Sequence, residues 1–286
     1  MGEDDKKINK VRSVLRHIWP ISHLLHEEKG PAFLKTLTIT VISLVSFVLV
    51  WQGLSMLLNS PYLPEPSIVL QAFVDAFNIT DISVGRNMWD NIYSSLNRVL
   101  WGFALAFVIA VPLGLVMGFS KTADDFSKPI IEVFRPIPPL AWAPVLIIAM
   151  GVFLGPVVVI FIGIFFPLLS NIVFGVRNID PILIDAARTL GAKRSHLFIK
   201  VILPSTIPYI MTGIRIGLGI GWMCIVAAEF IAPIGGGVGQ YIYFKSNIGR
   251  YDQVFAGLIV IAILGLVTTE LSGYIERRVS KRMGMS

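Results

Sequence analysis

The sequence is poor in charge. Only 15% of its 286 residues are Asp, Glu, Lys or Arg, whereas 55% are hydrophobic. A soluble domain carries about 25% charged residues, so this composition excludes a surface that faces water throughout. The apolar residues also stand in long blocks instead of at amphipathic spacing. The chain is therefore expected to be an all-α integral membrane protein.

Cysteine, histidine and nucleotide-binding motifs are scarce or missing. Cys224 is the one cysteine, and the histidines are His17, His23, His26 and His196. No intrachain disulfide and no metal-type Cys/His spacing is possible. The Gly-x-x-x-x-Gly-Lys-[Ser/Thr] phosphate loop, His-Glu-x-x-His and Gly-x-Ser-x-Gly are all absent. These absences argue against a membrane-embedded enzyme and against a cofactor or metal bound by this chain.

Six apolar blocks could cross a bilayer, whose core needs about 20 residues per helix. They cover residues 34–58, 99–119, 140–154, 157–176, 207–231 and 254–274. The first block is longer than the ~7–15 apolar residues of a signal peptide and has no cleavage pattern behind it, so a retained helix is expected. The third is short and follows Pro136, Pro138 and Pro139, which predicts a broken or tilted entry.

Lys and Arg fall mostly in alternate segments between these blocks. One group lies in residues 1–33, 177–206 and 277–286, together with Lys121, Lys128 and Arg135 between the second and third blocks. The positive-inside rule places these segments, and both termini, in the cytoplasm. The net charge of +6 therefore follows from membrane topology and does not indicate nucleic-acid binding.

Two segments outside the membrane are expected to have local structure. Residues 1–33 have apolar positions at helical spacing, which indicates either a helix on the membrane surface or a frayed tail. Residues 59–98 would form an outer-face segment with a proline-rich turn and a short amphipathic helix. The membrane-spanning core would then cover residues 99–276.

The segment 177–206 carries the strongest local signals. Asp180 followed by Pro181 is a helix start, and Gly191 is a helix stop. Ser195 could cap a second helix that Pro204 would end. The pattern predicts a helix–turn–helix between two spans.

Small side chains mark the first of these two helices. Ala186 and Ala187 beside Asp185 would let a partner approach the backbone closely. The alternative is an ordinary polar loop, and the residue types do not decide between the two.

The order Asp185-Ala186-Ala187, three residues, Gly191, nine residues, then Val-Ile-Leu203-Pro204 resembles the EAA loop of binding-protein-dependent ABC importer permeases. Asp stands here for the family's Glu, and Val for its first Ile. Within these permeases, residues 60–280 look most like the nitrate/sulfonate/taurine/bicarbonate branch. The similar stretches are Leu63–Ser67, Phe134–Ala141, Gly175–Arg177, Asp185–Ala192, Ala227–Glu229 and Gly235–Gly239.

This resemblance implies a type I ABC importer permease fold and a subunit that hydrolyses no ATP itself. Two separate ATPase chains would carry ATP and Mg, and an extracytoplasmic binding protein would deliver a small anionic solute to a permease in the cell membrane. Coupling residues would be Asp185, Ala186, Ala187, Gly191, Leu203 and Pro204. A homodimer is expected because nothing indicates an asymmetric half. The alternatives are a related permease for another small organic solute and a secondary transporter, which would favour a longer chain with internal repeats.

Three charges fall inside the apolar blocks. Arg215 would lie roughly 13 Å and Glu270 about 9 Å from the inner ends of their spans at 1.5 Å per residue. These depths predict an Arg215–Glu270 ion pair, with an anionic solute as the alternative partner of Arg215. Glu229 is nearer the outer end and is expected to reach water. The glycines at 235–237 and 239 are interpreted as a flexible turn over the pore mouth.

Glycines also mark one side of the fifth block. Gly213, Gly217 and Gly221 recur at every fourth position, a small-residue stripe that predicts close helix packing in a bilayer. The alternative is that the stripe lets helices slide as a pore opens, with Trp222 and Met223 narrowing the pore nearby.

Overall fold

The structure is a computed structural model that describes residues 31–78, 85–232 and 234–282. Every regular element within these ranges is a helix, and they contain no β-strand, which confirms the all-α expectation. Five of the described helices are long and apolar enough to cross a membrane. The surface helix expected near the N-terminus lies almost wholly outside the described residues, as does the end of the basic tail.

The chain divides into two compact units, and the first ends at Ile68. It contains α2 (Pro31–Leu58), which corresponds to the first expected span. Two side chains of α2 donate hydrogen bonds to the turn that follows. Trp51 Nε1 donates to the Pro64 carbonyl at 3.1 Å, and Ser55 Oγ to the Leu63 carbonyl at 2.8 Å. The predicted proline-rich turn is thus folded back onto the end of α2.

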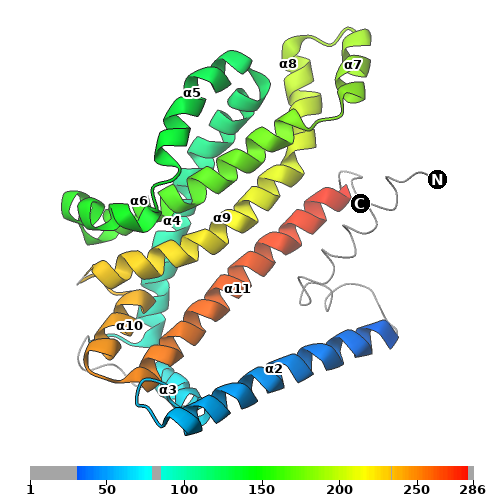
Figure 1. Cartoon of the computed structure of the whole chain (residues 1–286). Coiled ribbons are helices and arrows are strands. Elements are labelled where there is room, and N and C mark those ends of the chain that lie inside the picture. The colour runs from blue at the N-terminus through cyan, green and yellow to red at the C-terminus, as the bar shows by residue number, and fades with distance from the viewer. Residues whose placement is uncertain (1–30, 79–84, 233, 283–286) are drawn as a thin grey trace. The chain divides into compact units, whose positions relative to one another are not determined.

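The second unit begins at Val69 and holds the other helices (Figure 1). In chain order these are α3 (Pro66–Asn78), α4 (Met88–Phe119), α5 (Lys121–Phe134), α6 (Pro139–Arg177), α7 (Pro181–Thr189), α8 (Arg194–Leu197), a π-helical turn (Phe198–Ile202), α9 (Leu203–Ile231), α10 (Val238–Asn247) and α11 (Tyr251–Arg282). The helix α3 is the short amphipathic helix predicted after the proline-rich turn.

The third and fourth apolar blocks form two separate helical arms, as expected, but the arms join at Gly151 and not near residue 155. Both lie in α6, and the chain reverses inside it at Gly151, which has φ 82° and ψ 176°. A Cβ atom placed on Gly155 would lie 2.7 Å from Cα of Ile147, so the two arms of α6 fold back on each other. Glycine permits the reversal because it has no Cβ to clash at positive φ.

Helix α4 begins eleven residues before the expected start at Val99. The Asn87 side chain accepts from the Asp90 N–H, and the Asp90 carboxylate accepts from the Asn87 N–H, at 2.9 and 3.2 Å. This capping box satisfies backbone donors that the helix start leaves free. It places Arg98 inside a helix instead of in an outer loop.

The expectation that Pro204 ends a helix capped by Ser195 was wrong. Ser195 lies within α8, and one continuous helical segment of 38 residues runs from Arg194 to Ile231. The π-helical turn directly precedes α9 and changes the hydrogen-bonding register. Pro204 then stands in the first turn of α9, where its missing N–H is tolerated.

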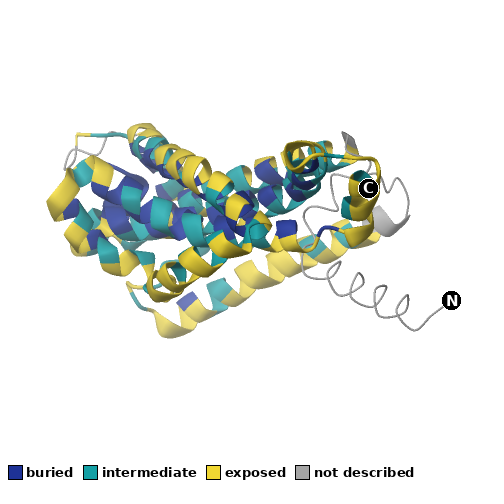
Figure 2. Ribbon diagram, turned by 90° about the horizontal axis from the view of Figure 1, so that it is seen from above, coloured by how far each residue is buried: buried dark blue, intermediate teal, exposed yellow. Residues whose placement is uncertain are grey.

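The core of the second unit is built on one ridge of α6. Its members recur at every fourth position and are fully buried: Ile160, Ile164, Leu168 and Ile172. Figure 2 shows that such buried positions gather where helices pack, while outward positions are exposed. Stripes of small residues face the ridge from two helices. The α4 stripe is Gly102, Ala106, Ala110, Gly114 and Gly118, and the α9 stripe is Gly213, Gly217 and Gly221.

These stripes bring the helix backbones close together. A Cβ atom on Gly114 would lie 2.8 Å from Cγ2 of Ile172, and one on Gly217 would lie 2.8 Å from Cγ2 of Ile164. Ridges fitted into grooves of this kind are how helices pack when lipid gives no hydrophobic drive for association. The structure thus places the predicted glycine stripe of α9 in close contact with α6.

Gly217→Leu should therefore lower the amount of folded protein, because overpacking a filled interface costs about 1–3 kcal/mol. Gly219→Leu is the matched control, since a Cβ atom there meets nothing within 4 Å. The yield of monodisperse protein and its melting temperature in detergent measure both variants. Equal yields and melting temperatures would show that the stripe is not a packing contact.

Candidate functional site

Helix α7 begins and ends as the sequence predicts. The Asp180 side chain accepts a hydrogen bond from the N–H of Ile182 at 2.9 Å, and Pro181 is the first helical residue. At the other end Gly191 has φ 77°, and the N–H of Ala192 bonds back to the Ala187 carbonyl at 3.0 Å. This left-handed closure stops the helix and turns the chain toward α8.

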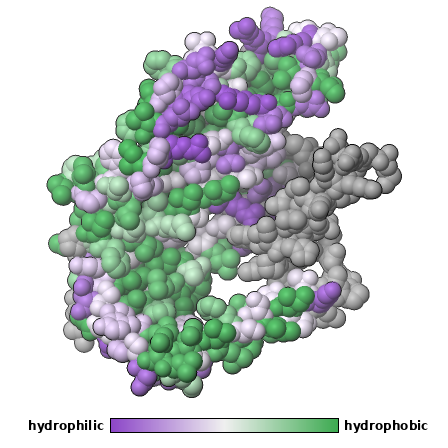
Figure 3. Space-filling view, in the orientation of Figure 1, coloured by the Kyte–Doolittle hydropathy of each residue, from purple (hydrophilic) through white to green (hydrophobic). Residues whose placement is uncertain are grey.

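No residue of α7 is buried. Ile182 is 73% exposed, and Leu190, which caps the helix, is 87% exposed. Asp185 lies 3.6 Å from Arg188 in a pair that is open to solvent and so adds little stability. Figure 3 shows hydrophilic residues gathered over this end of the second unit, around α7, α8 and the start of α5. Apolar side chains exposed on a helix within such a polar end form a surface for a partner protein.

The predicted coupling residues fall into two groups. Asp185, Ala186, Ala187 and Gly191 lie together on α7 and the turn that ends it, whereas Leu203 and Pro204 start α9 and are half-buried. The second group therefore lies where α9 begins. In the first group Asp185, Ala186 and Gly191 are exposed, whereas Ala187 is half-buried and packs against the core.

A buried ion pair lies at the opposite end of α9, where none was predicted. Nη1 of Arg98 lies 2.8 Å from Oε1 of Glu229, and the two side chains are 3% and 1% exposed. The Ser95 hydroxyl also lies 2.9 Å from each carboxylate oxygen. The expectation that Glu229 reaches water was wrong, because α4 and the loop after α9 enclose its carboxylate.

The glycine loop covers this pair and is pinned to it. Arg98 donates to the carbonyls of Gly235 and Gly236 at 3.0 and 2.6 Å, and the Gly239 N–H donates to Oε2 of Glu229 at 2.9 Å. A Cβ atom on Gly237 would collide with the Glu229 carboxylate. The loop expected to be a flexible turn therefore packs tightly over the ion pair, and we call it the glycine lid. Position 237 requires glycine because a side chain there would displace the ion pair.

The sequence does hold a signal for this cluster. Asn91, Ser95 and Arg98 are spaced so that they share one face of a helix. A polar face on an otherwise apolar helix needs a buried partner. Glu229 is the one carboxylate in the fifth apolar block. It was therefore the natural candidate for the buried partner of this polar face once α4 was known to begin at Met88.

The other membrane residues singled out in the sequence, Arg215, Trp222 and Met223, do not lie together in one site. Arg215 lies 4.0 Å from Glu276 of α11, and the expected pairing with Glu270 stays a prediction. Trp222 is buried, and its Nε1 donates to the Thr268 hydroxyl of α11 at 2.9 Å. Met223 is 75% exposed. Trp222 and Met223 thus face different sides of α9, and only Met223 is open to line a path.

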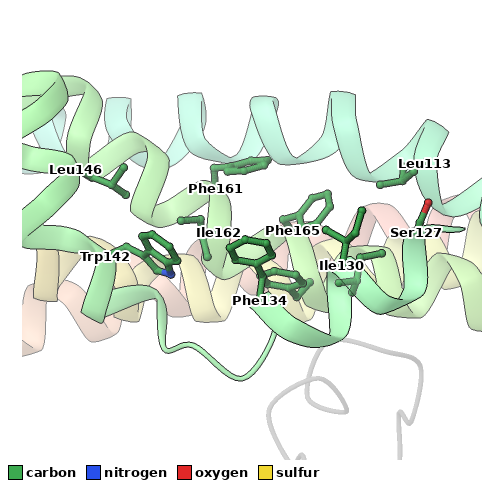
Figure 4. A pocket seen from close by; sticks show the side chains of 11 residues that line it. Leu113, Ser127, Ile130, Phe134, Trp142, Leu146, Phe161, Ile162 and Phe165 are labelled. Atoms are coloured by element: carbon green, nitrogen blue, oxygen red, sulfur yellow. The ribbon is translucent and has the colours of Figure 1, made fainter.

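An apolar pocket of about 470 Å³ lies between α5 and the two arms of α6 (Figure 4). Aromatic rings dominate its walls: Phe134, Trp142, Phe161, Phe165 and Phe166. The hydroxyl of Ser127 is almost the sole polar group among the lining side chains. Such walls suit hydrocarbon and offer nothing to fix a polar solute.

The fold and the α7 surface together define a class of protein. Several membrane-spanning helices with a docking helix between two spans are the design of a transport permease driven by another subunit. The model of the family "Binding-protein-dependent transport system inner membrane component" matches residues 110–281. The chain belongs to this family and is a permease subunit of an ABC importer.

Known proteins agree in sequence and in fold. The taurine transport system permease protein TauC of Escherichia coli (strain K12) is 34% identical over 265 residues, which are 88% of each chain. The nitrate import permease protein NrtB of Leptolyngbya laminosa is 37% identical over 195 residues, 68% of this chain and 70% of NrtB. An inward-facing structure of the MetNI methionine ABC transporter aligns with TM-score 0.59 and 20% identity, covering 67% of this chain and 97% of that chain. This last likeness shows the fold alone.

Removing one member of the buried ion pair should be costly. Arg98→Met or Glu229→Met leaves an unpaired buried charge, and the free energy of unfolding should fall by about 3–5 kcal/mol. The double variant should recover most of the lost free energy of unfolding, because it leaves neither charge unpaired. Lys128→Met is the control, because its pair with Glu132 is exposed on both sides and is worth about 0.3–0.5 kcal/mol. Denaturant unfolding in detergent measures all four variants, and a double variant no more stable than the singles would contradict the argument.

Proposed function

We propose that two identical copies of this chain form the path by which a small anionic solute enters the cell. A separate ATPase subunit would dock on α7 of each copy. The observation that carries the proposal is α7 itself, a capped helix with no buried residue that leaves Ile182, Leu183 and Leu190 exposed.

The orientation of the chain in the membrane follows from the same helix. With α7 in the cytoplasm, the lysines and arginines around α5, α7 and α8 lie on the cytoplasmic side, in agreement with the positive-inside rule. The glycine lid and α10 then face outward, where a solute-binding protein would deliver its cargo. ATP and Mg would be held by the ATPase, since the chain has no phosphate-loop motif. The complex would lie in the cytoplasmic membrane.

The class of solute is supported by the relatives. One is named for taurine, which carries a sulfonate group, and another for nitrate. Both groups are compact, with negative charge spread over oxygen atoms. A small oxyanion or sulfonate is therefore the proposed cargo of this chain.

Gly191→Val should uncouple ATP hydrolysis from transport. Valine at φ 77° is strained by about 1–2 kcal/mol, and relief of that strain would move α7 off its partner. We expect taurine or nitrate uptake into proteoliposomes to fall at least about tenfold, the effect of 1.4 kcal/mol, while ATPase activity continues.

Gly249→Val is the matched control. Gly249 has φ 72° and open space around it, as Gly191 does, but it lies in the turn between α10 and α11. Gly249→Val should therefore carry the same backbone strain without uncoupling ATP hydrolysis from transport. Normal uptake by Gly191→Val, or equal losses in both variants, would refute a coupling role for α7.

Copurification with the ATPase should yield two copies of this chain per complex. Two differently tagged copies expressed together should be recovered in one complex of two permease and two ATPase chains, measured by native mass spectrometry. A complex that contains this chain together with a different permease chain would exclude the homodimer.

A further inference from the structure

A second pocket, of about 380 Å³, differs from the apolar one in its polar groups. It is enclosed by the turn between α5 and α6, the second arm of α6 and one side of α9. Arg135, Ser170 and Asn171 line it together with apolar residues such as Ile162 and Ile220. It combines a cation, a hydroxyl and an amide within one transmembrane unit.

The pocket lies deep in the membrane. Asn171 and Gly163 stand six and fourteen residues before Arg177, where α6 ends. At 1.5 Å per residue these positions are roughly 9 and 21 Å from that end, within a hydrocarbon core of about 30 Å. The sequence assigned Arg135 to a cytoplasmic loop, and the structure shows that it lines this pocket together with residues of α6 that are expected to lie within the membrane.

Among the described residues no carboxylate lies within 4.0 Å of the Arg135 guanidinium, whereas Arg98 and Arg177 each have an ion-pair partner. A charged side chain at this depth is costly unless it meets a counter-charge or water, and such residues mark ion and substrate pathways. The side chain is exposed, so its charge is accessible from the pocket.

The α6 wall of the pocket also offers polar backbone. Pro167 has no N–H and cannot donate to the carbonyl of Gly163, and both residues line the pocket. The amide of Asn171 donates to the Pro167 carbonyl at 2.8 Å, which leaves its oxygen facing away from that bond. Freed backbone groups at membrane depth are satisfied where a helix lines water. We therefore expect this pocket to hold water, in contrast to the aromatic one beside it.

We infer that this pocket is an anion-binding site on the solute path, in which Arg135 supplies the positive charge and Ser170 a hydrogen bond. The inference rests on the proposed function and names residues that would contact the solute in the inner half of the membrane. A sulfonate or nitrate group would replace the missing carboxylate partner of Arg135, since guanidinium groups match planar and tripodal oxyanions with two parallel donors.

Thiol labelling tests the pocket without a known solute. Ser170→Cys would be made with Cys224→Ala in the full complex and treated in membrane vesicles. The anionic probe is sulfonatoethyl methanethiosulfonate, and the cationic probe is trimethylammonioethyl methanethiosulfonate. A field focused by Arg135 should make the anionic probe react about tenfold faster relative to the cationic one, and adding Arg135→Gln should abolish that preference.

Two cysteine controls bracket the result. Ser127→Cys sits in the apolar pocket and should react slowly with both probes, whereas Lys128→Cys on the exposed side of α5 should react quickly with both. If Ser170→Cys is as unreactive as Ser127→Cys, the pocket is dry and the inference fails. A preference for the anionic probe that survives Arg135→Gln also overturns it.

Transport separates this inference from the proposed function. Arg135→Gln should reduce taurine or nitrate uptake at least about tenfold, the effect of 1.4 kcal/mol, with Arg135→Lys retaining more activity and basal ATPase activity intact in both. If the unmodified complex takes up neither taurine nor nitrate, the proposed solute class is refuted. The ratio of the two labelling rates then still tests whether the pocket attracts anions. Full uptake by Arg135→Gln would refute the pocket and leave the proposed function standing.

Discussion

The ion pair between Arg98 and Glu229 is the interaction on which the outer end of the core depends. It joins α4 to the end of α9 across 131 residues of sequence, and the glycine loop takes its shape from the same two side chains. A carboxylate and a guanidinium removed from water are stable only when their remaining donors and acceptors are also satisfied. Ser95 and the backbone of Gly235, Gly236 and Gly239 supply most of those contacts, while Nε of Arg98 has no hydrogen-bond partner among the described residues. The helices and the loop must therefore adopt one arrangement together, because none of them can satisfy this cluster alone.

Close packing fixes the rest of the core. In lipid, apolar side chains gain nothing from leaving the solvent, so helices are held by contact and by polar bonds. The ridge from Ile160 to Ile172 fits between backbones that come near because α4 and α9 carry small residues. This contact holds the middle of the helices, and the ion pair holds their ends. Neither requires the outward side chains, which are free to face lipid or a partner.

Local signals in the sequence were reliable at α7 but not at Ser195 and Pro204, and contacts between distant residues were not predicted. The bounds of α7 could be predicted because Asp180, Pro181 and Gly191 act on their own backbone. The glycine stripe of α9 was visible because four-residue spacing has one meaning on a helix. The Arg98–Glu229 pair could not be found this way, since its members meet only after α4 and α9 pack. The reversal between the third and fourth blocks was predicted, but its position at Gly151 was not, because an apolar run gives no sharp signal for the residue at which the chain folds back.

The uninterrupted helix from Arg194 to Ile231 makes the two ends of the second unit parts of one rod. At 1.5 Å per residue it is about 57 Å long, and it starts three residues after the turn that closes α7. A single long helix can transmit a tilt along its length. If a partner moves α7, we expect α9 to carry that movement to the glycine lid at its other end, turning about its contact with the α6 ridge. Such a helix would link the two faces of the membrane without any further element between them.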